Sequence, residues 1–496
     1  MRVLLPLPVV LPLLGAGLSM AAARRRWLQR AIGLTVLTIT TAVSVAILVG
    51  VDRDGPAAAF MGGWEAPVGI SLVADRFSAL LLVVASPVLV AVLVFAIGQP
   101  GTEQEQPGFH PVYLVLASGV ALSFLTGDLF NLFVAFEMML TASYVLITIG
   151  GRADQVRSGM TYVVINLVAS VLFVGLLGLL YAALGTVNMA DLAEGMGSLP
   201  PSLRLAFALM MFVVFGIKAA VFPLFFWLPD SYPTAPTAVT AVFAGLLTKV
   251  GVYCIIRTQT LIVPPADRPI GFLLVIAGLT MVIGVLGAIA QDDMKRILSF
   301  HIVSQIGYMI LGLALFTVAG LAAAILFVVN QIVLKSTLLL SAGMVDHAAG
   351  SAQISHIGGL ARRFPVLGWL FLLPALSLAG IPPFSGFVAK LAVVDAGFDE
   401  QAWAVVAASL AVSVLTLYSM TKIWGGAFWG TPEVVVEPDD AVTARFGGTM
   451  PMVVSTGTLV VGTLALALFA GPLFELCQRA GADLLDPVAY RTAVLG

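Results

Sequence analysis

Long apolar stretches recur along the whole chain, with short polar segments between them. A helix that crosses a bilayer needs about 20 mainly apolar residues. Helices satisfy their own backbone hydrogen bonds in lipid, so the pattern predicts an all-α polytopic membrane protein of about 14 transmembrane helices. The stretches cover roughly residues 3–22, 31–51, 78–98, 111–127, 130–149, 159–184, 203–228, 235–257, 270–290, 301–318, 320–344, 366–394, 402–423 and 448–473.

Composition excludes a soluble protein. Only 10% of the residues are charged and 60% are apolar, with a mean hydropathy of +1.06, whereas soluble domains average about 25% charged residues. The net charge of −2 gives no indication of nucleic acid as a partner. Cys254 and Cys477 form no disulfide framework and no metal-ligand spacing, so the sequence predicts neither a metal nor a cofactor.

The basic residues predict an orientation. Arg24, Arg25, Arg26 and Arg30 follow the first apolar stretch, which is the pattern of an anchor with an outside N-terminus and not of a cleaved signal peptide. Loops on that cluster's side of the membrane carry 12 Lys and Arg, against eight on the other side. Because cytoplasmic loops are enriched in Lys and Arg, both termini are predicted to lie outside the cytoplasm.

Five ionisable residues lie near the middle of apolar stretches: Glu137, Lys218, Lys249, Lys335 and Lys390. Four of the six lysines are therefore intramembrane, whereas no arginine occupies such a position. A buried lysine can release its proton and an arginine cannot, so the bias indicates titration. The five positions share a similar depth on five separate stretches and predict a proton-carrying row. Static ion pairs are the alternative.

Two lysine-bearing stretches, the seventh and the twelfth, also contain helix breakers. Proline removes a backbone donor, so both helices are predicted to be interrupted at depth, with plain kinks as the alternative. The lysine precedes the breakers in one stretch and follows them in the other, as two inverted five-helix repeats would require. The breakers are Pro223 and Pro229 after Lys218, and Gly380, Pro382, Pro383 and Gly386 around the turn before Lys390.

This pattern predicts four regions. Residues 1–110 hold helices 1–3, residues 111–257 the first repeat with helices 4–8, residues 270–424 the inverted repeat with helices 9–13, and residues 425–496 helix 14 and a tail.

At these motifs the sequence resembles the antiporter-like proteins shared by respiratory complex I, membrane-bound hydrogenases and Mrp-type Na⁺/H⁺ antiporters. The resemblance covers about residues 70–425 and is greatest to the D-type subunits of Mrp antiporters. The five ionisable residues match the family's glutamate and lysines. The motifs are GDLFNLFVAFEMMLTASYVL, IKAAVFPLFFWLPDSY, LLTKVGVY, QDDMKRILSFHIVSQIGYM, NQIVLKSTLLLSAG and PPFSGFVAK.

Several positions bear on the choice within the family. Phe225 stands where complex I relatives often carry a histidine, which favours Mrp antiporters. The sequence around His301 also resembles that of Mrp antiporters more than that of complex I relatives. Asn330 and Gln331 stand where family members often have a histidine one turn before the lysine, so no histidine relay is assigned there. Lys390 agrees with both the A-type and the D-type Mrp subunits, and the short chain favours the D-type.

The resemblance implies a proton path in a multisubunit Na⁺/H⁺ antiporter of a bacterial-type cell (inner) membrane, with other membrane subunits as partners. In this hypothesis Glu137 pairs with Lys218, and opening of the pair sends a proton toward Lys249 and onward. His301 is a candidate for proton uptake or release, or an ordinary interfacial histidine. Asp128 is a second candidate, or the cap of a helix.

Three other functions stay open at this point: a proton-pumping membrane subunit of a complex I-like or hydrogenase redox complex, a self-sufficient transporter, and a scaffold with static ion pairs. No flavin, iron–sulfur or quinone motif is found, so redox chemistry would belong to partners. Glu137 is the only mid-span carboxylate found, which makes a Na⁺ site within this chain alone doubtful.

Overall fold

The computed structural model describes residues 1–102, 106, 108–431 and 441–496, and most of them are helical. The elements of the first half are α1 (Leu7–Ala21), α2 (Arg26–Asp54), β1 (Ala57–Phe60), η1 (Met61–Gly63), β2 (Ser71–Ala74), α3 (Arg76–Gly98), α4 (Phe109–Leu125), α5 (Leu129–Thr148), α6 (Ala153–Leu184), α7 (Met189–Gly195), η2 (Met196–Ser198), α8 (Pro201–Ala219), α9 (Leu228–Ser231), η3 (Tyr232–Thr234), α10 (Thr237–Val242), η4 (Phe243–Leu247) and α11 (Thr248–Leu261).

The elements of the second half are η5 (Pro265–Asp267), α12 (Ile270–Ile289), α13 (Met294–Ala314), α14 (Val318–Ala349), α15 (Leu360–Arg363), α16 (Pro365–Ala379), α17 (Ser385–Asp399), α18 (Trp403–Ile423), η6 (Trp424–Trp429), α19 (Ala441–Phe446), α20 (Met450–Leu468), α21 (Ala470–Leu485) and α22 (Val488–Leu495). The segments η4 and η6 are π-helical, and the other η segments are 3₁₀ turns.

Apolar helices of membrane-spanning length dominate the described part of the chain. Eleven helices there are long and apolar enough to cross a membrane, and α1, α4 and α16 are shorter apolar helices. The prediction of an all-α polytopic membrane protein is confirmed. The total of 14 crossings, the two inverted repeats and the four regions remain predictions.

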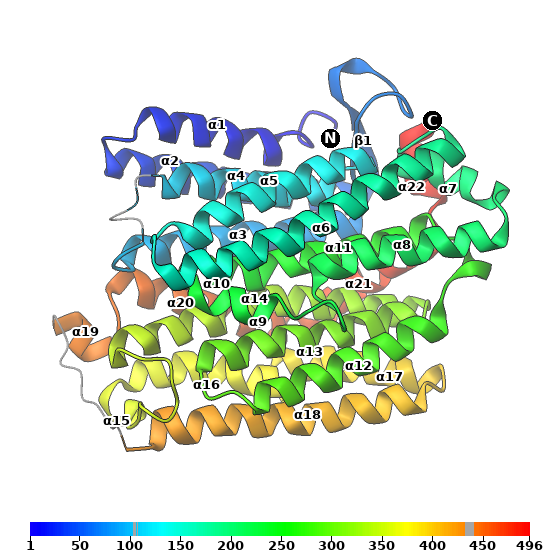
Figure 1. Ribbon diagram of the computed structural model, residues 1–496. Helices are drawn as coiled ribbons and strands as arrows, with labels where there is room; N and C mark the ends of the chain where they lie inside the picture. The colour runs from blue at the N-terminus through cyan, green and yellow to red at the C-terminus, as the bar shows by residue number, and fades with distance from the viewer. Residues whose placement is uncertain (103–105, 107, 432–440) are drawn as a thin grey trace.

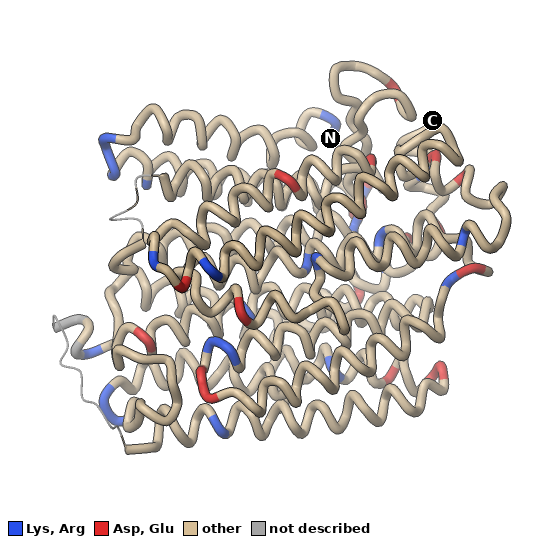
Figure 2. The backbone as a smooth tube through the Cα atoms, in the orientation of Figure 1, with Lys and Arg blue, Asp and Glu red and all other residues tan. Residues whose placement is uncertain are grey.

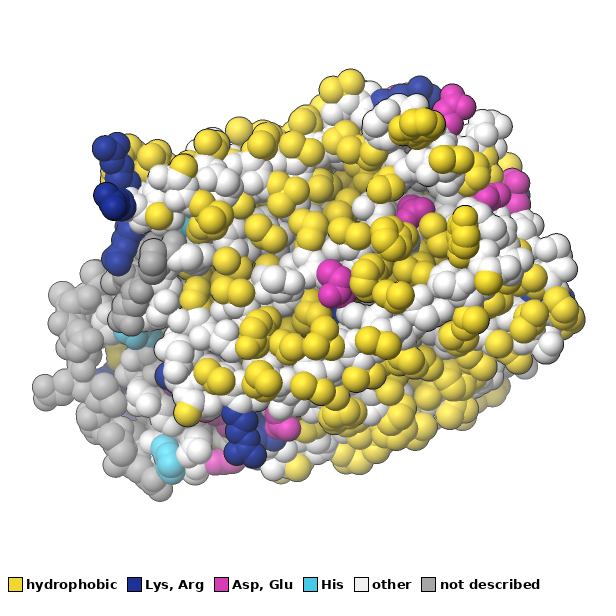
Figure 3. Space-filling view, turned by 45° about the horizontal axis from the view of Figure 1, so that its top comes forward, with side chains coloured by type: hydrophobic (Ala, Val, Ile, Leu, Met, Phe, Trp, Pro, Cys, Tyr) yellow, Lys and Arg dark blue, Asp and Glu magenta, His cyan; other side chains and the backbone are white. Residues whose placement is uncertain are grey.

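The long helices run side by side in one bundle (Figure 1). Helix α14 packs against α13, α17, α20 and α21, and nearly all of its middle is buried. Helices α11 and α13 are also buried almost throughout, whereas α2, α6 and α18 leave much of their surface exposed. Hydrophobic side chains cover much of the outer face in Figure 3. The bundle therefore has a hydrophobic outer surface, as contact with lipid requires.

The termini share one end of the bundle. Strands β1 and β2 form an antiparallel hairpin, with Ala57 opposite Ala74 and Phe60 opposite Ser71, and α22 packs on β1. Met1 packs on Gly50 near the same end of α2. Charged positions gather mainly at the two ends of the bundle (Figure 2). Which end faces the cytoplasm remains a prediction from the basic loops.

Several predicted stretches have different limits in the structure, the tenth, twelfth and fourteenth among them. The tenth was expected to begin at residue 301, but α13 begins at Met294, because the Asp293 side chain caps it by accepting a hydrogen bond from the Arg296 N–H at 2.8 Å. The twelfth consists of two helices, α16 and α17. The fourteenth continues beyond residue 473 as the amphipathic helix α21, which packs along α14.

Candidate functional site

The five ionisable residues lie on five different helices, α5, α8, α11, α14 and α17. The four lysines are buried, and Lys335 is 0% exposed. Glu137 is half-buried and lies on α5, whose outer face also exposes Phe130 and Val134. The row therefore begins at the surface of the bundle and continues through its interior.

Glu137 and Lys218 are joined through α6 and not by a direct ion pair in the described structure. The Ser170 hydroxyl donates to Glu137 Oε1 and lies 3.0 Å from the Asn166 carbonyl oxygen. Lys218 Nζ donates to that same carbonyl at 3.4 Å and lies 5.4 Å from the centre of the Phe136 ring. The expected direct contact between the two charges is replaced by this link.

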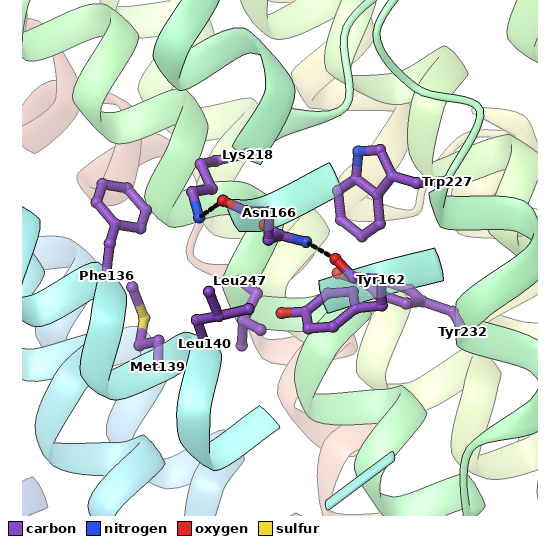
Figure 4. Close-up of a pocket in the computed structure, with 9 residues that line it drawn as sticks. All are labelled: Phe136, Met139, Leu140, Tyr162, Asn166, Lys218, Trp227, Tyr232 and Leu247. Atoms are coloured by element: carbon purple, nitrogen blue, oxygen red, sulfur yellow. Dashed lines mark hydrogen bonds between the residues drawn. The ribbon is translucent and has the colours of Figure 1, made fainter. Parts of the chain in front are cut away.

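A small cavity, which we call the inner cavity, adjoins Lys218 (Figure 4). Its volume is about 20 Å³, and its lining includes Tyr162, Asn166, Trp227 and Tyr232. One water needs roughly 10–15 Å³ of such space together with polar partners. The cavity is therefore large enough for about one water beside the Lys218 ammonium.

Lys249 lies where α11 follows the π-helical segment η4. Its Nζ donates to the Ala244 carbonyl at 2.5 Å and contacts the Thr248 hydroxyl at 3.3 Å. A Cβ atom on Gly251 would lie 2.5 Å from the backbone nitrogen of Ala219, so α11 and α8 touch backbone to backbone beside Lys218. A π-helical segment interrupts the regular backbone hydrogen bonds of an α-helix. The Ala244 carbonyl in this segment accepts from the lysine.

Lys335 lies at the centre of the bundle, next to a contact between α14 and the π-helical segment. Ser336 donates to the Ala241 carbonyl at 3.2 Å, and a Cβ on Gly245 would overlap the Ser336 oxygen. Lys335 Nζ has no hydrogen-bond partner among the described residues. An ammonium or amine that is buried without a partner is costly, which points to bound water.

Unpaired amides lie close to Lys335. Helices α13 and α14 are consecutive and antiparallel, and Tyr308 stacks on Phe327 with ring centroids 5.1 Å apart. From this pair, residues before Tyr308 on α13 lie level with residues after Phe327 on α14. Gln305 is therefore level with the next polar residues of α14, and His301 is level with Lys335. Both polar side-chain atoms of Gln305, together with Asn330 Nδ2 and Gln331 Oε1, are buried and have no partner within the described chain.

Lys390 lies beside the break between α16 and α17. Its Nζ donates to the Ala379 carbonyl at 3.1 Å and lies 5.5 Å from the Tyr308 ring centre. Ala379 ends α16, and helix ends leave carbonyls without intrahelical partners. One turn before Lys390, the Ser385 hydroxyl donates to Asn330 Oδ1 at 2.7 Å, which connects this lysine to α14.

The structure places the predicted breakers as follows. Helix α8 ends at Ala219, and the chain is not regularly helical until α9 begins at Leu228, so Pro223 lies in the gap and Pro229 in the first turn of α9. The second gap lies between Ala379 and Ser385. It contains Gly380, Pro382 and Pro383, whereas Gly386 is already in α17.

Of the two candidates for proton uptake or release, His301 differs from the expectation and Asp128 agrees with its helix-cap alternative. His301 does not begin a span at the interface. It lies seven residues inside α13, or about 10 Å, is fully buried, and its Nε2 is 2.9 Å from the Ser419 hydroxyl. Asp128 is the N-cap of α5, and its Oδ1 accepts from the Asn131 N–H at 2.8 Å. Asp128 therefore has the geometry of a helix cap, which is the second of the two roles predicted for it.

Sequence reasoning did not single out Asn166 and Ser170. Both lie with Tyr162 at four-residue intervals on α6, so a polar stripe on an otherwise apolar helix was the available signal. It also missed the buried ion pair between Arg257 Nη2 and Asp75 Oδ2 at 2.6 Å, both 3% exposed. Arg257 lay at the end of its predicted stretch, whereas α11 continues to Leu261.

Among the described residues, no group of three or more His, Cys, Asp or Glu side chains is arranged to hold a metal ion. The chemistry of the site is therefore that of amines, one carboxylate, hydroxyls and freed carbonyls.

Comparisons with known proteins point in one direction. A family model described as NADH:quinone oxidoreductase/Mrp antiporter, TM, matches residues 126–416. The D subunit of the Na(+)/H(+) antiporter of Alkalihalophilus pseudofirmus is 42% identical over 500 residues, covering 100% of both chains. The corresponding D subunit of the Na(+)/H(+) antiporter of Bacillus subtilis is 36% identical over 491 residues, covering 99% of this chain and 98% of the relative.

Solved structures of membrane complexes share the fold. A chain in the Mrp complex from Dietzia sp. DQ12-45-1b superposes with a TM-score of 0.94 at 36% identity, with full coverage of both chains. A chain in the membrane-bound sulfane sulfur reductase, an archaeal respiratory membrane complex, gives a TM-score of 0.90 at 25% identity, again with full coverage.

Proposed function

The chain belongs to the NADH:quinone oxidoreductase/Mrp antiporter family of transmembrane proteins, and we propose that it is the proton-translocating subunit of a multisubunit Na⁺/H⁺ antiporter. Full-length similarity to two proteins named as D subunits of Na(+)/H(+) antiporters supports a transporter subunit. Similarity to a chain of an Mrp complex supports assembly with other membrane subunits. We propose that the protein lies in a bacterial cell membrane.

The observation that carries the proposal is a series of contacts between helices, each of which lies beside one or two of the five ionisable residues. Ser170 and Asn166 connect Glu137 to Lys218. The α8–α11 contact at Gly251 and the Gly245–Ser336 contact continue it past Lys249 to Lys335. The remaining step, to Lys390, passes the hydrogen bond between Asn330 and Ser385.

Lysine suits this task for a physical reason. Desolvation disfavours the charged amine, and a nearby carboxylate favours it, so small rearrangements in the bundle move the proton. A guanidinium would stay charged throughout. We propose that Glu137 favours the charged form of Lys218, and that weakening of their link through Ser170 and Asn166 releases a proton toward Lys249 and onward to Lys335 and Lys390. His301 is the candidate for an additional step beside Lys335.

Sodium is assigned to the complex and not to this chain alone. Sodium and similar cations are held by clusters of oxygen ligands, and Glu137 is the only mid-span carboxylate in the sequence. Because Glu137 lies at the surface of the bundle, a neighbouring subunit is able to reach it.

The alternative function is a proton-pumping subunit of a respiratory complex. The likeness to the archaeal respiratory complex is compatible with it. The higher identity, 42% over the full length, to a protein named as an antiporter subunit favours the antiporter.

The test is purification of the intact complex that contains this chain, followed by reconstitution into vesicles. An imposed Na⁺ gradient is expected to move protons in the opposite direction, as a dye inside the vesicles would report. Copurification with redox subunits, together with proton movement that needs an electron donor and ignores Na⁺, would establish the alternative.

A further inference from the structure

A polar pocket of about 410 Å³, which we call the outer pocket, lies at one end of the bundle. Its walls come from the start of α6, the turn after α9, the start of α13 and the end of α14. The residues that matter for the argument are Gln155, Thr234, Asp293, Lys295 and Asp346. This is the end that carries the basic loops and lies opposite the termini.

Groups able to hold and pass protons gather in the outer pocket. Lys295 Nζ and Asp346 Oδ2 form an ion pair at 2.5 Å. Asp293 is half-buried, and burial raises the pKa of its carboxyl above the usual value, with the charge of Asp346 acting in the same direction. The backbone N–H of Arg296 and the charge of Lys295 oppose that shift. Such a carboxyl binds protons more readily than a solvated aspartate.

A single short turn separates the outer pocket from the inner cavity at Lys218. Thr234 lines the outer pocket, whereas Tyr232, two residues earlier, lines the inner cavity. The turn is held to α6 by Ser231, whose hydroxyl donates to the Ser158 carbonyl at 3.4 Å. Residues of the same short turn therefore line both spaces.

Tyr232 has the features of a group that works between the two spaces. Its side chain is 0% exposed, and its hydroxyl has no hydrogen-bond partner among the described residues. Its ring is fixed by Trp227 and Phe243, with centroids 5.7 and 5.6 Å away. A tyrosine hydroxyl can both donate and accept a hydrogen bond. Because this one is buried, unpaired and next to a cavity that fits one water, it is able to bind that water.

We propose that the outer pocket collects protons and passes them to Lys218 through the turn at 231–236, with the Tyr232 hydroxyl as the positioning group for the water in the inner cavity. The hydroxyl oxygen accepts a hydrogen bond or a proton from one side while its own hydrogen is given to the water or amine on the other. This inference rests on the proposed function and assigns its point of proton access.

The first experiment uses Tyr232→Phe in the full reconstituted complex, because this change removes only the hydroxyl. Na⁺-driven proton transport is expected to fall by about 100-fold, the lower end of what proton-transfer groups contribute. The matched control is Tyr113→Phe, a fully buried tyrosine whose hydroxyl donates to the Leu89 carbonyl at 2.8 Å. It loses a hydrogen bond outside both spaces and is expected to transport normally.

The second experiment tests water access. Both native cysteines are buried, so Thr234→Cys gives a single reactive thiol for a membrane-impermeant methanethiosulfonate. We expect the reagent to label this cysteine from one side of the membrane only and to block transport. A reducing agent is expected to remove the label and restore transport. Ser198→Cys, exposed at the opposite end, serves as the control and is expected to be labelled without a block.

Absence of labelling at position 234 in the assembled complex would overturn the inference, as would complete labelling with unchanged transport. Normal transport by Tyr232→Phe would remove the tyrosine from the path. These results differ from failure of the proposed function, in which the unmodified complex itself shows no Na⁺-driven proton movement.

Discussion

Among the five ionisable side chains, Glu137 is the one that reaches the surface of the bundle. The sequence was enough to identify all five positions, because a charge in an apolar stretch is conspicuous. It could not show that Glu137 meets Ser170 instead of Lys218, since that depends on how far α5 lies from α8 and on which side chain of α6 fills the gap. Contacts between helices are set by packing, which no single stretch encodes.

Replacing Glu137 by glutamine is expected to abolish antiport without preventing assembly. Glutamine keeps the shape and can still accept from Ser170, but it removes the negative charge that favours a protonated Lys218. The measurement is Na⁺-driven proton transport per assembled complex in vesicles. Glu194→Gln, an exposed carboxylate on α7, is the control and should transport normally. Full activity in Glu137→Gln would contradict the proposed role.

Lys249→Arg distinguishes a titrating group from a fixed charge. The side chain is 1% exposed, and arginine preserves its charge and its ability to donate to the Ala244 carbonyl while holding its proton at any working pH. Transport is expected to fall by at least about 100-fold, as for loss of a proton-transfer group. Lys422→Arg is the control, since Lys422 only donates to backbone carbonyls. Normal transport by Lys249→Arg would favour static ion pairing.

At the scale of elements, the long apolar stretches located the helices well and their ends less well. His301 was expected at the start of a span, but the polar residues before it form two further turns of α13, which begins at the Asp293 cap and packs against α12 and α14. The β1–β2 hairpin and α7 escaped prediction, since elements of four to seven residues are too short to give the long apolar signal of a membrane span.

The break between α16 and α17 offers a prediction about backbone geometry. Gly380 has φ +85°, and a Cβ there would lie 2.9 Å from Lys390 Cδ. Gly380→Ala is therefore expected to destabilise the chain by about 1–2 kcal/mol and to displace the lysine, lowering transport per folded complex. Thermal unfolding and transport are measured on the same preparation.

Gly185→Ala separates these two effects. Gly185 has φ +73°, and a Cβ there would meet nothing within 4 Å. The same backbone strain should lower stability to a similar degree and leave transport unchanged. Equal transport by the two variants would show that Lys390 does not depend on the glycine.

At the scale of the whole molecule, both ends of the chain are fastened at one end of the bundle. Arg257 of α11 pairs with Asp75 before α3, and its guanidinium lies 5.0 Å from the Tyr490 ring of α22. Nearby, Arg76 pairs with both Asp52 of α2 and Asp483 of α21. This assembly of distant segments was invisible in the sequence, where the residues are spread over more than 400 positions.

Asp75→Asn is expected to destabilise the protein by about 3–5 kcal/mol, because it leaves the buried Arg257 charge without its partner. Asparagine caps helices as well as aspartate does, so the cap of α3 is preserved. The double variant Asp75→Asn with Arg257→Gln should recover much of the loss. Thermal unfolding of the complex provides the comparison, and a double variant no more stable than Asp75→Asn would argue against the pair.

The link between Glu137 and Lys218 depends on which oxygen receives the single hydroxyl hydrogen of Ser170. A hydroxyl has one hydrogen, so Ser170 is unable to donate fully to both the carboxylate and the Asn166 carbonyl at the same time. When it turns to Glu137, the carbonyl accepts from Lys218 beside its regular helical N–H partner. When it turns back, the lysine must share that oxygen with the hydroxyl as well. If the proposed function holds, a change in the charge state of the carboxylate at the rim is expected to reach the amine inside the bundle through the rotation of one O–H bond, without direct contact between the two ions.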